Sequence, residues 1–125
     1  WSLALRRDTS SAPEVDRLQR ALAGGDTVIT TGIVLQELLQ GFRGPKAAER
    51  IIQRFSLLPL VVPEIDDHIE AARWRNHCRR KGIQVGTIEA LIAQLCIRYE
   101  LLLLARDDDF EHMARHTPLS LLTVD

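Results

Sequence analysis

The sequence predicts an α/β domain with a mostly parallel sheet. Short apolar segments typical of buried strands alternate with longer segments whose apolar residues recur at helical spacing. The connections between these segments are short and are marked by glycine or proline. A chain of 125 residues can bury a real core but suits one compact unit, so we expect a single domain over residues 1–125.

The first half of the chain begins this alternation. In residues 12–25, Pro13 stands at a helix start, apolar residues follow at helical spacing, and glycine ends the segment, which predicts an amphipathic helix. The segments after it are a short strand at 26–31, a helix at 32–42, an amphipathic helix at 45–55 and an apolar segment at 57–62.

The second half continues the pattern. Residues 64–82 predict a charged helix that ends at Gly82. The segments after it are a nearly all-apolar helix at 87–100, a buried strand at 101–105 and a last strand at 119–125. Strands that alternate with helices are typical of an α/β domain whose sheet is mostly parallel.

Composition narrows the classes of function. Hydrophobic residues make up 46% of the chain and charged residues 26%, and no apolar run approaches the roughly 20 residues that span a bilayer, so we expect no membrane segment. Cys78 and Cys96 form no C-x-x-C pair, which favours reduced thiols in a cytoplasmic protein. A net charge of −1 argues against binding nucleic acid by bulk electrostatics, so any such contact must be local.

Three adjacent aspartates follow the predicted strand 101–105. In parallel sheets, side chains that do chemistry collect beyond the carboxyl ends of the strands, which is where Asp107, Asp108 and Asp109 are expected. Helix capping is the simpler explanation for one of them, because Asp108 and Glu111 have the spacing of a capping-box variant. A cap does not require three aspartates, so Asp107 and Asp109 are candidate functional residues.

Glu89 occupies an unusual side of its predicted helix. The polar residues Thr87, Gln94 and Arg98 form one stripe, and Glu89 falls on the opposite side among apolar neighbours. A carboxylate that faces a core is costly unless it is paired, protonated or bound to a cation. Alternatively, a glutamate in the first turn simply interacts with the helix dipole and bends toward solvent. Both interpretations stay open on this residue alone.

Glu37 lies at the rim of the apolar arc of helix 32–42, where a solvated boundary residue is the simpler interpretation. However, Glu37 and Glu89 each occur on a helix just after a strand or loop, from which both can project toward the edge that carries Asp107. Such an acidic pocket needs a counter-charge, and Mg²⁺ or Mn²⁺ supplies it because these ions prefer oxygen ligands. The natural reaction is hydrolysis of a phosphodiester by metal-activated water.

The residues resemble a PIN-domain ribonuclease of the VapC toxin type. The resemblance covers nearly the whole chain and rests on the segments "WSLALRRD", "ELLQG" (37–41) and "GTIEALIAQLCIRYELLLLARDDDF" (86–110). It implies a three-layer α/β/α fold with a mostly parallel central sheet. It also implies a Mg²⁺- or Mn²⁺-dependent endoribonuclease that cuts RNA, is the toxin of a toxin–antitoxin pair, is inhibited by a small VapB-like antitoxin protein, and forms a homodimer.

Carried over from this resemblance, Glu37 matches the second acid of the family, Glu89 the third and Asp107 the fourth, with Asp109 as an auxiliary ligand. The chain departs from the family at Glu89, because the usual third acid is aspartate. The first acid of the family lies in a strand that would immediately precede Trp1, so we expect that strand upstream of residue 1.

Two other functions compete with the enzyme. One is a PIN-like binding module that kept its partner-binding surface but lost catalysis through the missing first acid and Glu89. The other is a receiver-like pocket that accepts phosphate. It fits less well, because its paired acids should follow the first strand and a lysine should follow a late one.

Residues 72–82 hold the densest positive charge of the chain. This segment can contact RNA phosphates near an acidic site, or it can form a solvated helix face with cations near the C-terminal dipole. Trp74 within it can stack on a base or pack against its neighbours. The four histidines lack zinc-binding spacing with the cysteines, so we assign them no role.

Overall fold

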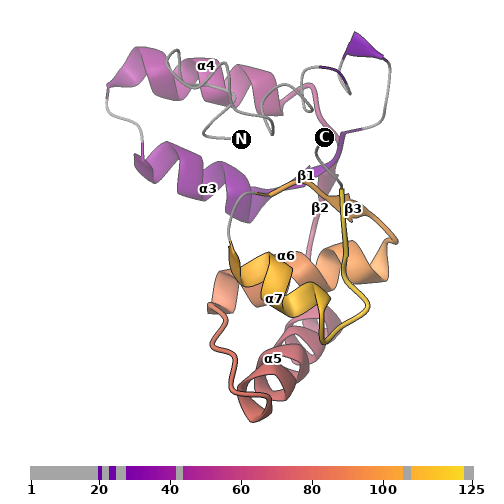
Figure 1. The fold of residues 1–125 in the computed structure, drawn as a ribbon. Coiled ribbons are helices and arrows are strands. Elements are labelled where there is room, and N and C mark those ends of the chain that lie inside the picture. The colour runs from indigo at the N-terminus through magenta and orange to yellow at the C-terminus, as the bar shows by residue number, and fades with distance from the viewer. Residues whose placement is uncertain (1–19, 21–22, 25–27, 42–43, 106–107, 123–125) are drawn as a thin grey trace. The chain divides into compact units, whose positions relative to one another are not determined.

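The structure, a computed structural model, describes residues 20, 23–24, 28–41, 44–105 and 108–122 (Figure 1). Its elements in chain order are β1 (Thr30–Thr31), α3 (Gly32–Gly41), α4 (Pro45–Phe55), β2 (Leu60–Val61), α5 (Ile65–Arg80), α6 (Thr87–Arg98), β3 (Leu102–Leu103), α7 (Asp108–Ala114) and β4 (Ser120–Leu121). Strands and helices therefore alternate as the α/β prediction requires.

The described strands form two short parallel pairs. β1 pairs with β2, with Thr30 opposite Leu60, and β3 pairs with β4, with Leu102 opposite Ser120. Parallel strands need a long crossover between them, which α3 and α4 provide for the first pair and α7 provides for the second. The parallel pairing confirms the predicted class, while each strand is shorter than the apolar segment that predicted it.

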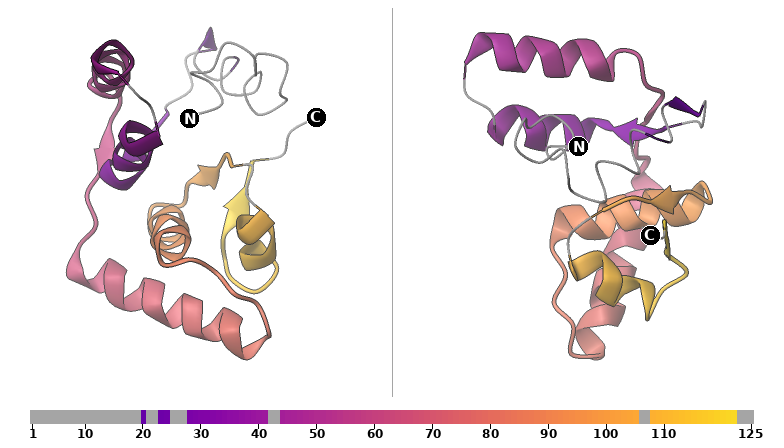
Figure 2. Two further views of the ribbon diagram at one scale, coloured as in Figure 1. Left: turned by 90° about the vertical axis from the view of Figure 1, so that its left-hand side faces the viewer. Right: turned by 45° about the horizontal axis from the view of Figure 1, so that its top comes forward.

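The chain divides into two compact units, Trp1–Val62 and Pro63–Asp125. In the first unit, α3 and α4 lie side by side (Figure 2) because both are amphipathic and bury their apolar faces together. Their core consists of Leu38, Ile51 and Phe55, with Val34, Leu35 and Leu39 packed against it. That all 125 residues form one domain stays a prediction.

The second unit is built around α6, which is buried along most of its length. α5 packs along α6 over the most extensive helix pairing of the described residues, and α7 packs on α6 as well. The core of this unit is completed by Ala71, Cys78, Val85, Phe110, Met113 and Leu119. The second unit therefore has a hydrophobic core of its own.

Both long helices of the second unit end in the same backbone motif. At the end of α5, Ile83 N–H donates to Cys78 O over 2.9 Å, and Gly82 N–H donates to Arg79 O over 3.0 Å. This bonding requires a left-handed residue just past the helix, and Gly82, at φ 80°, supplies it. The glycine stop predicted for this helix is confirmed.

The end of α6 uses the motif without glycine. Leu101 N–H donates to Cys96 O over 2.8 Å, and Glu100 adopts φ 53° at the left-handed position. A side chain at positive φ is strained because Cβ crowds the backbone. With Glu100 in this strained conformation, the chain turns directly from α6 into β3.

Most of the predicted helix at 12–25 lies outside the described residues. The helix predicted at 45–55 is observed with the same bounds. The helices predicted at 32–42 and 87–100 begin at the observed first residues of α3 and α6, and the remaining predicted bounds of α3, α5 and α6 differ from the observed ones by one or two residues. None of the described helices is long and apolar enough to cross a membrane.

Candidate functional site

Glu89 lies in the first turn of α6, three residues after the N-cap residue Gly86. Its side chain is half-buried and folds back over the start of its own helix. A Cβ atom placed on Gly86 would collide with Oε2 of Glu89, and it would lie 2.9 Å from Cδ and 3.5 Å from Oε1. The Glu89 carboxylate therefore occupies the space that a side chain at position 86 would fill.

No side chain caps the N-terminus of α6, because the N-cap residue is glycine. The backbone N–H groups of the first turn carry the positive end of the helix dipole, which favours a carboxylate nearby. Among the described residues, Glu89 makes no hydrogen bond and no ion pair with another side chain. No donor in the part of the chain that the structure describes occupies either of its oxygens.

α7 begins at the same end of the second unit as α6, and the two helices lie side by side (Figures 1 and 2). The first turn of α7 contains Asp108, which is exposed, and Asp109, which is half-buried. Two helix starts thus carry carboxylates at one end of this unit. Asp107 lies outside the described residues.

Glu37 belongs to the first unit, where it lies on the exposed face of α3. Among the residues that the structure describes, no three histidine, cysteine, aspartate or glutamate side chains form a metal-binding group. Because Asp107 is not among those residues, the clustering of Glu37, Glu89, Asp107 and Asp109 stays a prediction. The donor set itself consists of carboxylate oxygens, which suits Mg²⁺ or Mn²⁺ and disfavours zinc.

A polar network between α5 and α6 was not predicted from the sequence. It is centred on Asp67, of which only 1% is exposed. Arg98 donates to Oδ2 of Asp67 over 2.6 Å, Gln94 donates to Oδ1 over 3.3 Å, and the backbone N–H of Glu64 donates to Oδ2 over 2.8 Å. Every oxygen of this buried carboxylate is therefore partnered.

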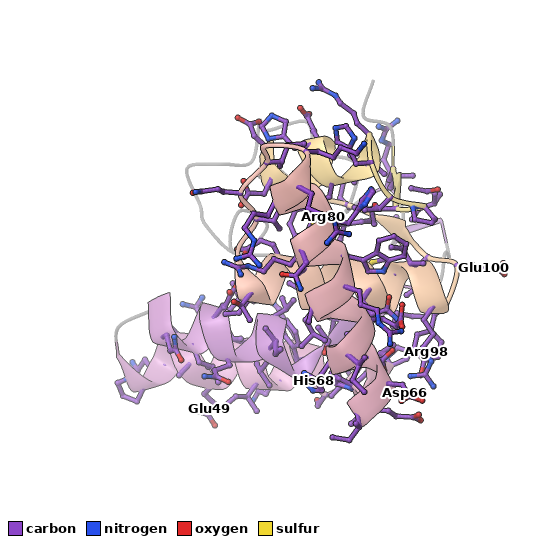
Figure 3. The ribbon with its side chains drawn as sticks, turned by 90° about the horizontal axis from the view of Figure 1, so that it is seen from below. Glu49, Asp66, His68, Arg80, Arg98 and Glu100 are labelled. Atoms are coloured by element: carbon purple, nitrogen blue, oxygen red, sulfur yellow. The ribbon has the colours of Figure 1, made fainter. Side chains whose placement is uncertain are left out.

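The same network extends at both ends. Trp74 donates its indole N–H to Oε1 of Gln94 over 2.8 Å, and Arg98 forms an ion pair with Glu64 at 3.2 Å. Figure 3 shows Arg98 near the first turn of α5, where Asp66 lies, and Arg80 at the opposite end of that helix. The network fixes α6 on α5 from the middle of α6 to its last turn.

Charge and burial act in opposite directions on Asp67. Burial alone would raise the pKa of its carboxyl, but the Glu64 N–H, the Gln94 amide and the Arg98 guanidinium together outweigh it and lower that pKa. Asp67 is therefore ionised in the folded protein at neutral pH. A buried carboxylate with this many partners is structural, so it is not a candidate ligand.

The network shows where the polar stripe of α6 lies. The polar stripe of α6 is not its solvent face, because Gln94 is buried and the Arg98 side chain is 33% exposed, both against α5. Glu89 lies on the side of α6 opposite this stripe. Because the stripe packs against α5, the side that carries Glu89 is not the only side of α6 that is buried. The signal that could have revealed the network is Asp67 itself, an acid on the apolar side of α5.

The basic segment of α5 is largely occupied by local contacts. Arg73 pairs with Glu70, Arg79 donates to Asn76, and Arg75 donates its Nε–H to the Val85 carbonyl over 2.8 Å. The hydrogen bond from Trp74 to Gln94 favours the packing interpretation of that side chain over base stacking. Arg80 and Lys81 remain as exposed cations at the end of the helix.

Both cysteines are buried and free. Burial raises the pKa of the Cys78 thiol and raises that of Cys96 to about 11. Both thiols are therefore protonated at neutral pH, which disfavours a role as nucleophile.

Alternating helices and short parallel strands, with carboxylates at two helix starts, define an α/β protein with an acidic candidate site. The chain matches the PIN domain family over residues 3–116, and since this is most of its length, the protein belongs to that family. PIN domains are generally nucleases that act on RNA and use divalent metals. A search of curated proteins gave no match.

Proposed function

We propose that the protein is a metal-dependent endoribonuclease. The observation that supports this most is the placement of Glu89 in a chain that belongs to a nuclease family: its carboxylate stands at an uncapped helix start without a protein partner among the described residues. A half-buried carboxylate of this kind is suited to bind a cation, which supplies a counter-charge that none of the described residues provides.

In this proposal, Glu37, Glu89 and Asp107 hold Mg²⁺ or Mn²⁺, and Asp109 is an auxiliary ligand. The bound ion would provide a water nucleophile and neutralise the charge that develops on the phosphodiester. The protein's own part would be to bring carboxylates from α3, from the start of α6 and from the segment around the start of α7 to one place. The α5–α6 network supports this part, because it fixes the helix that carries Glu89.

We also propose the biological setting implied by the resemblance to VapC-type toxins. In that setting the protein is the toxin of a toxin–antitoxin pair in the cytoplasm, forms a homodimer, and is inhibited by a VapB-like antitoxin. Large exposed apolar side chains support protein contacts of this kind, for example Leu57 at 84% exposed and Val62 at 74% in the first unit. Light scattering of the full-length protein, alone and with its co-encoded partner, tests both associations.

A second candidate is a binding module that has lost catalysis. The observation that favours it is the fold of Glu89 over its own helix N-terminus, where the helix dipole stabilises the carboxylate without any metal. In this case Glu89 would be a structural replacement for the family's aspartate. The protein would then bind RNA or a partner protein without cutting RNA.

An RNA cleavage assay of the full-length protein distinguishes the two candidates. The assay is run with Mg²⁺ or Mn²⁺ and with a chelator, on the wild type and on Glu89→Gln and Asp107→Asn variants. We expect cleavage that the chelator abolishes and that falls at least about 100-fold in both variants, because each removes a charge from the metal site. The matched control is Glu100→Gln, which makes the same chemical change at the exposed far end of α6 (Figure 3).

Cleavage that persists at the wild-type rate in both variants would refute the enzyme. No cleavage by the wild type, together with intact RNA or partner binding, would establish the binding module.

A further inference from the structure

Gly86 is not needed for its backbone conformation. Its φ of −67° and ψ of 156° are ordinary extended values that any residue adopts. This sets it apart from Gly44 and Gly82, which have positive φ. A glycine at position 86 therefore requires another physical reason, and size is the remaining property in which glycine differs from every other residue.

The structure gives that reason in the packing of Glu89. The carboxylate of Glu89 fills the space next to Gly86 so closely that a Cβ atom would collide with Oε2. By contrast, Cβ atoms placed on Gly32 or Gly41 would meet nothing within 4 Å. Of the described glycines, Gly86 alone has its missing side chain replaced by a functional group of the candidate site.

The position is also one where other residues would cap the helix better. Serine, aspartate and asparagine are the best N-cap residues because their side chains accept a backbone N–H, and glycine ranks below them, about equal to threonine. α6 has no side-chain cap at Gly86, and the Glu89 carboxylate lies where a capping side chain would be. A longer acid thus reaches back to the helix start through a gap that only glycine leaves open.

We propose that Gly86 is a positioning residue for metal binding: by lacking a side chain, it admits the Glu89 carboxylate beside the start of α6 and sets where that carboxylate meets the ion. This inference rests on the proposed function, because it assumes that Glu89 is a metal ligand. It explains how the chain accommodates glutamate where its family usually has aspartate, since the extra methylene is taken up by folding back over Gly86.

The test measures Mn²⁺ affinity by titration, with free Mn²⁺ followed by electron paramagnetic resonance, on the full-length protein. In Gly86→Ala, the new methyl group displaces the end of a flexible side chain and alanine is a weaker N-cap residue than glycine, so we expect a modestly lower thermal unfolding midpoint and a Mn²⁺ affinity lower by about 10-fold. The matched control is Gly32→Ala, which adds the same methyl group at a helix start where it meets open space.

A double-variant cycle identifies the route of the effect. Aspartate at position 89 is too short to fold back over residue 86, so Gly86→Ala should cost no Mn²⁺ affinity when it is added to Glu89→Asp. Unchanged affinity in Gly86→Ala, or an equal loss with either acid at position 89, would overturn the inference. A loss of stability without a loss of affinity would also overturn it, because Gly86 would then be purely structural.

Glu89→Gln separates this inference from the proposed function. If Glu89→Gln leaves Mn²⁺ affinity unchanged, the assignment of Glu89 as a ligand fails, and the inference fails with it. If Glu89→Gln weakens Mn²⁺ binding but Gly86→Ala does not, only the role of Gly86 is refuted.

Discussion

The polar side chains at the two ends of α6 differ in whether they have hydrogen-bonding or charged partners among the described residues. Toward the C-terminus, Gln94 and Arg98 are bound into the network around Asp67, and Arg98 also lies over the Tyr99 ring at 4.6 Å from its centroid. At the N-terminus, Glu89 has no hydrogen-bonding or charged partner among the described residues. The comparison separates polar groups that build the fold from a polar group that is available for a ligand.

The difference is one of satisfied bonding rather than of burial. Asp67 is more buried than Glu89, so burial alone would make Asp67 the stronger candidate for a functional residue. Three donors stabilise the charge of Asp67, whereas the described residues provide the charge of Glu89 with the helix dipole and no hydrogen-bond donor. A count of partners therefore identifies the candidate ligand better than depth does.

The largest expected effect that tests this comparison is on stability. Asp67→Ala should lower the free energy of unfolding by about 1–3 kcal/mol, because it leaves the buried Gln94 amide without this acceptor and removes the carboxylate partner of Arg98. Glu89→Gln should change it by less than about 0.5 kcal/mol. Urea unfolding measures both, with the exposed neighbour Asp66→Ala as the control. Equal losses at positions 67 and 89 would show that Glu89 is structural too.

A smaller effect is expected in the pH dependence of stability. Because the pKa of Asp67 is lower in the folded state than in the unfolded state, its contribution is complete at neutral pH and is lost as the pH falls below about 4. Urea unfolding of the wild type and of Asp67→Asn over a pH series measures this contribution. The wild type should be the more stable protein at pH 7, and the difference should shrink in acid. A difference that does not change with pH would contradict the ionised network.

The smallest effect is expected just past the end of α6. Glycine tolerates the positive φ of Glu100, so Glu100→Gly should stabilise the protein by up to about 1 kcal/mol. Thermal unfolding measures the gain. Glu100→Ala removes the same carboxylate but keeps a Cβ atom, so it should give no gain. An equal gain in both variants would mean that the charge, and not the backbone, was unfavourable there.

Much of the fold could be predicted from local sequence. Pro45 and Gly82 mark helix boundaries because proline and glycine act on the backbone of their own position. Strand lengths could not be predicted in the same way. The apolar segment at 101–105 predicts five strand residues, but only Leu102 and Leu103 pair, because pairing depends on a partner strand distant in sequence.

The candidate site was predictable only in part. The position of Glu89 in the first turn of its helix follows from spacing, but its fold over Gly86 depends on side-chain packing. The stripe of Gln94 and Arg98 and the acid at position 67 are each visible in the sequence, but only the structure shows that they lie opposite each other on two helices. A polar side chain and its buried partner must be seen together before either can be interpreted.

The short loop 81–86 between α5 and α6 has a consequence for how the protein folds. Since the two helices are neighbours in sequence, they can meet before any of the parallel strands has found its partner. Their paired interior, from Ala71 to Cys96, is expected to form early and to hold its amide protons longest in exchange with deuterated water. The helix that carries Glu89 would then be in place on α5 before β3 pairs with β4.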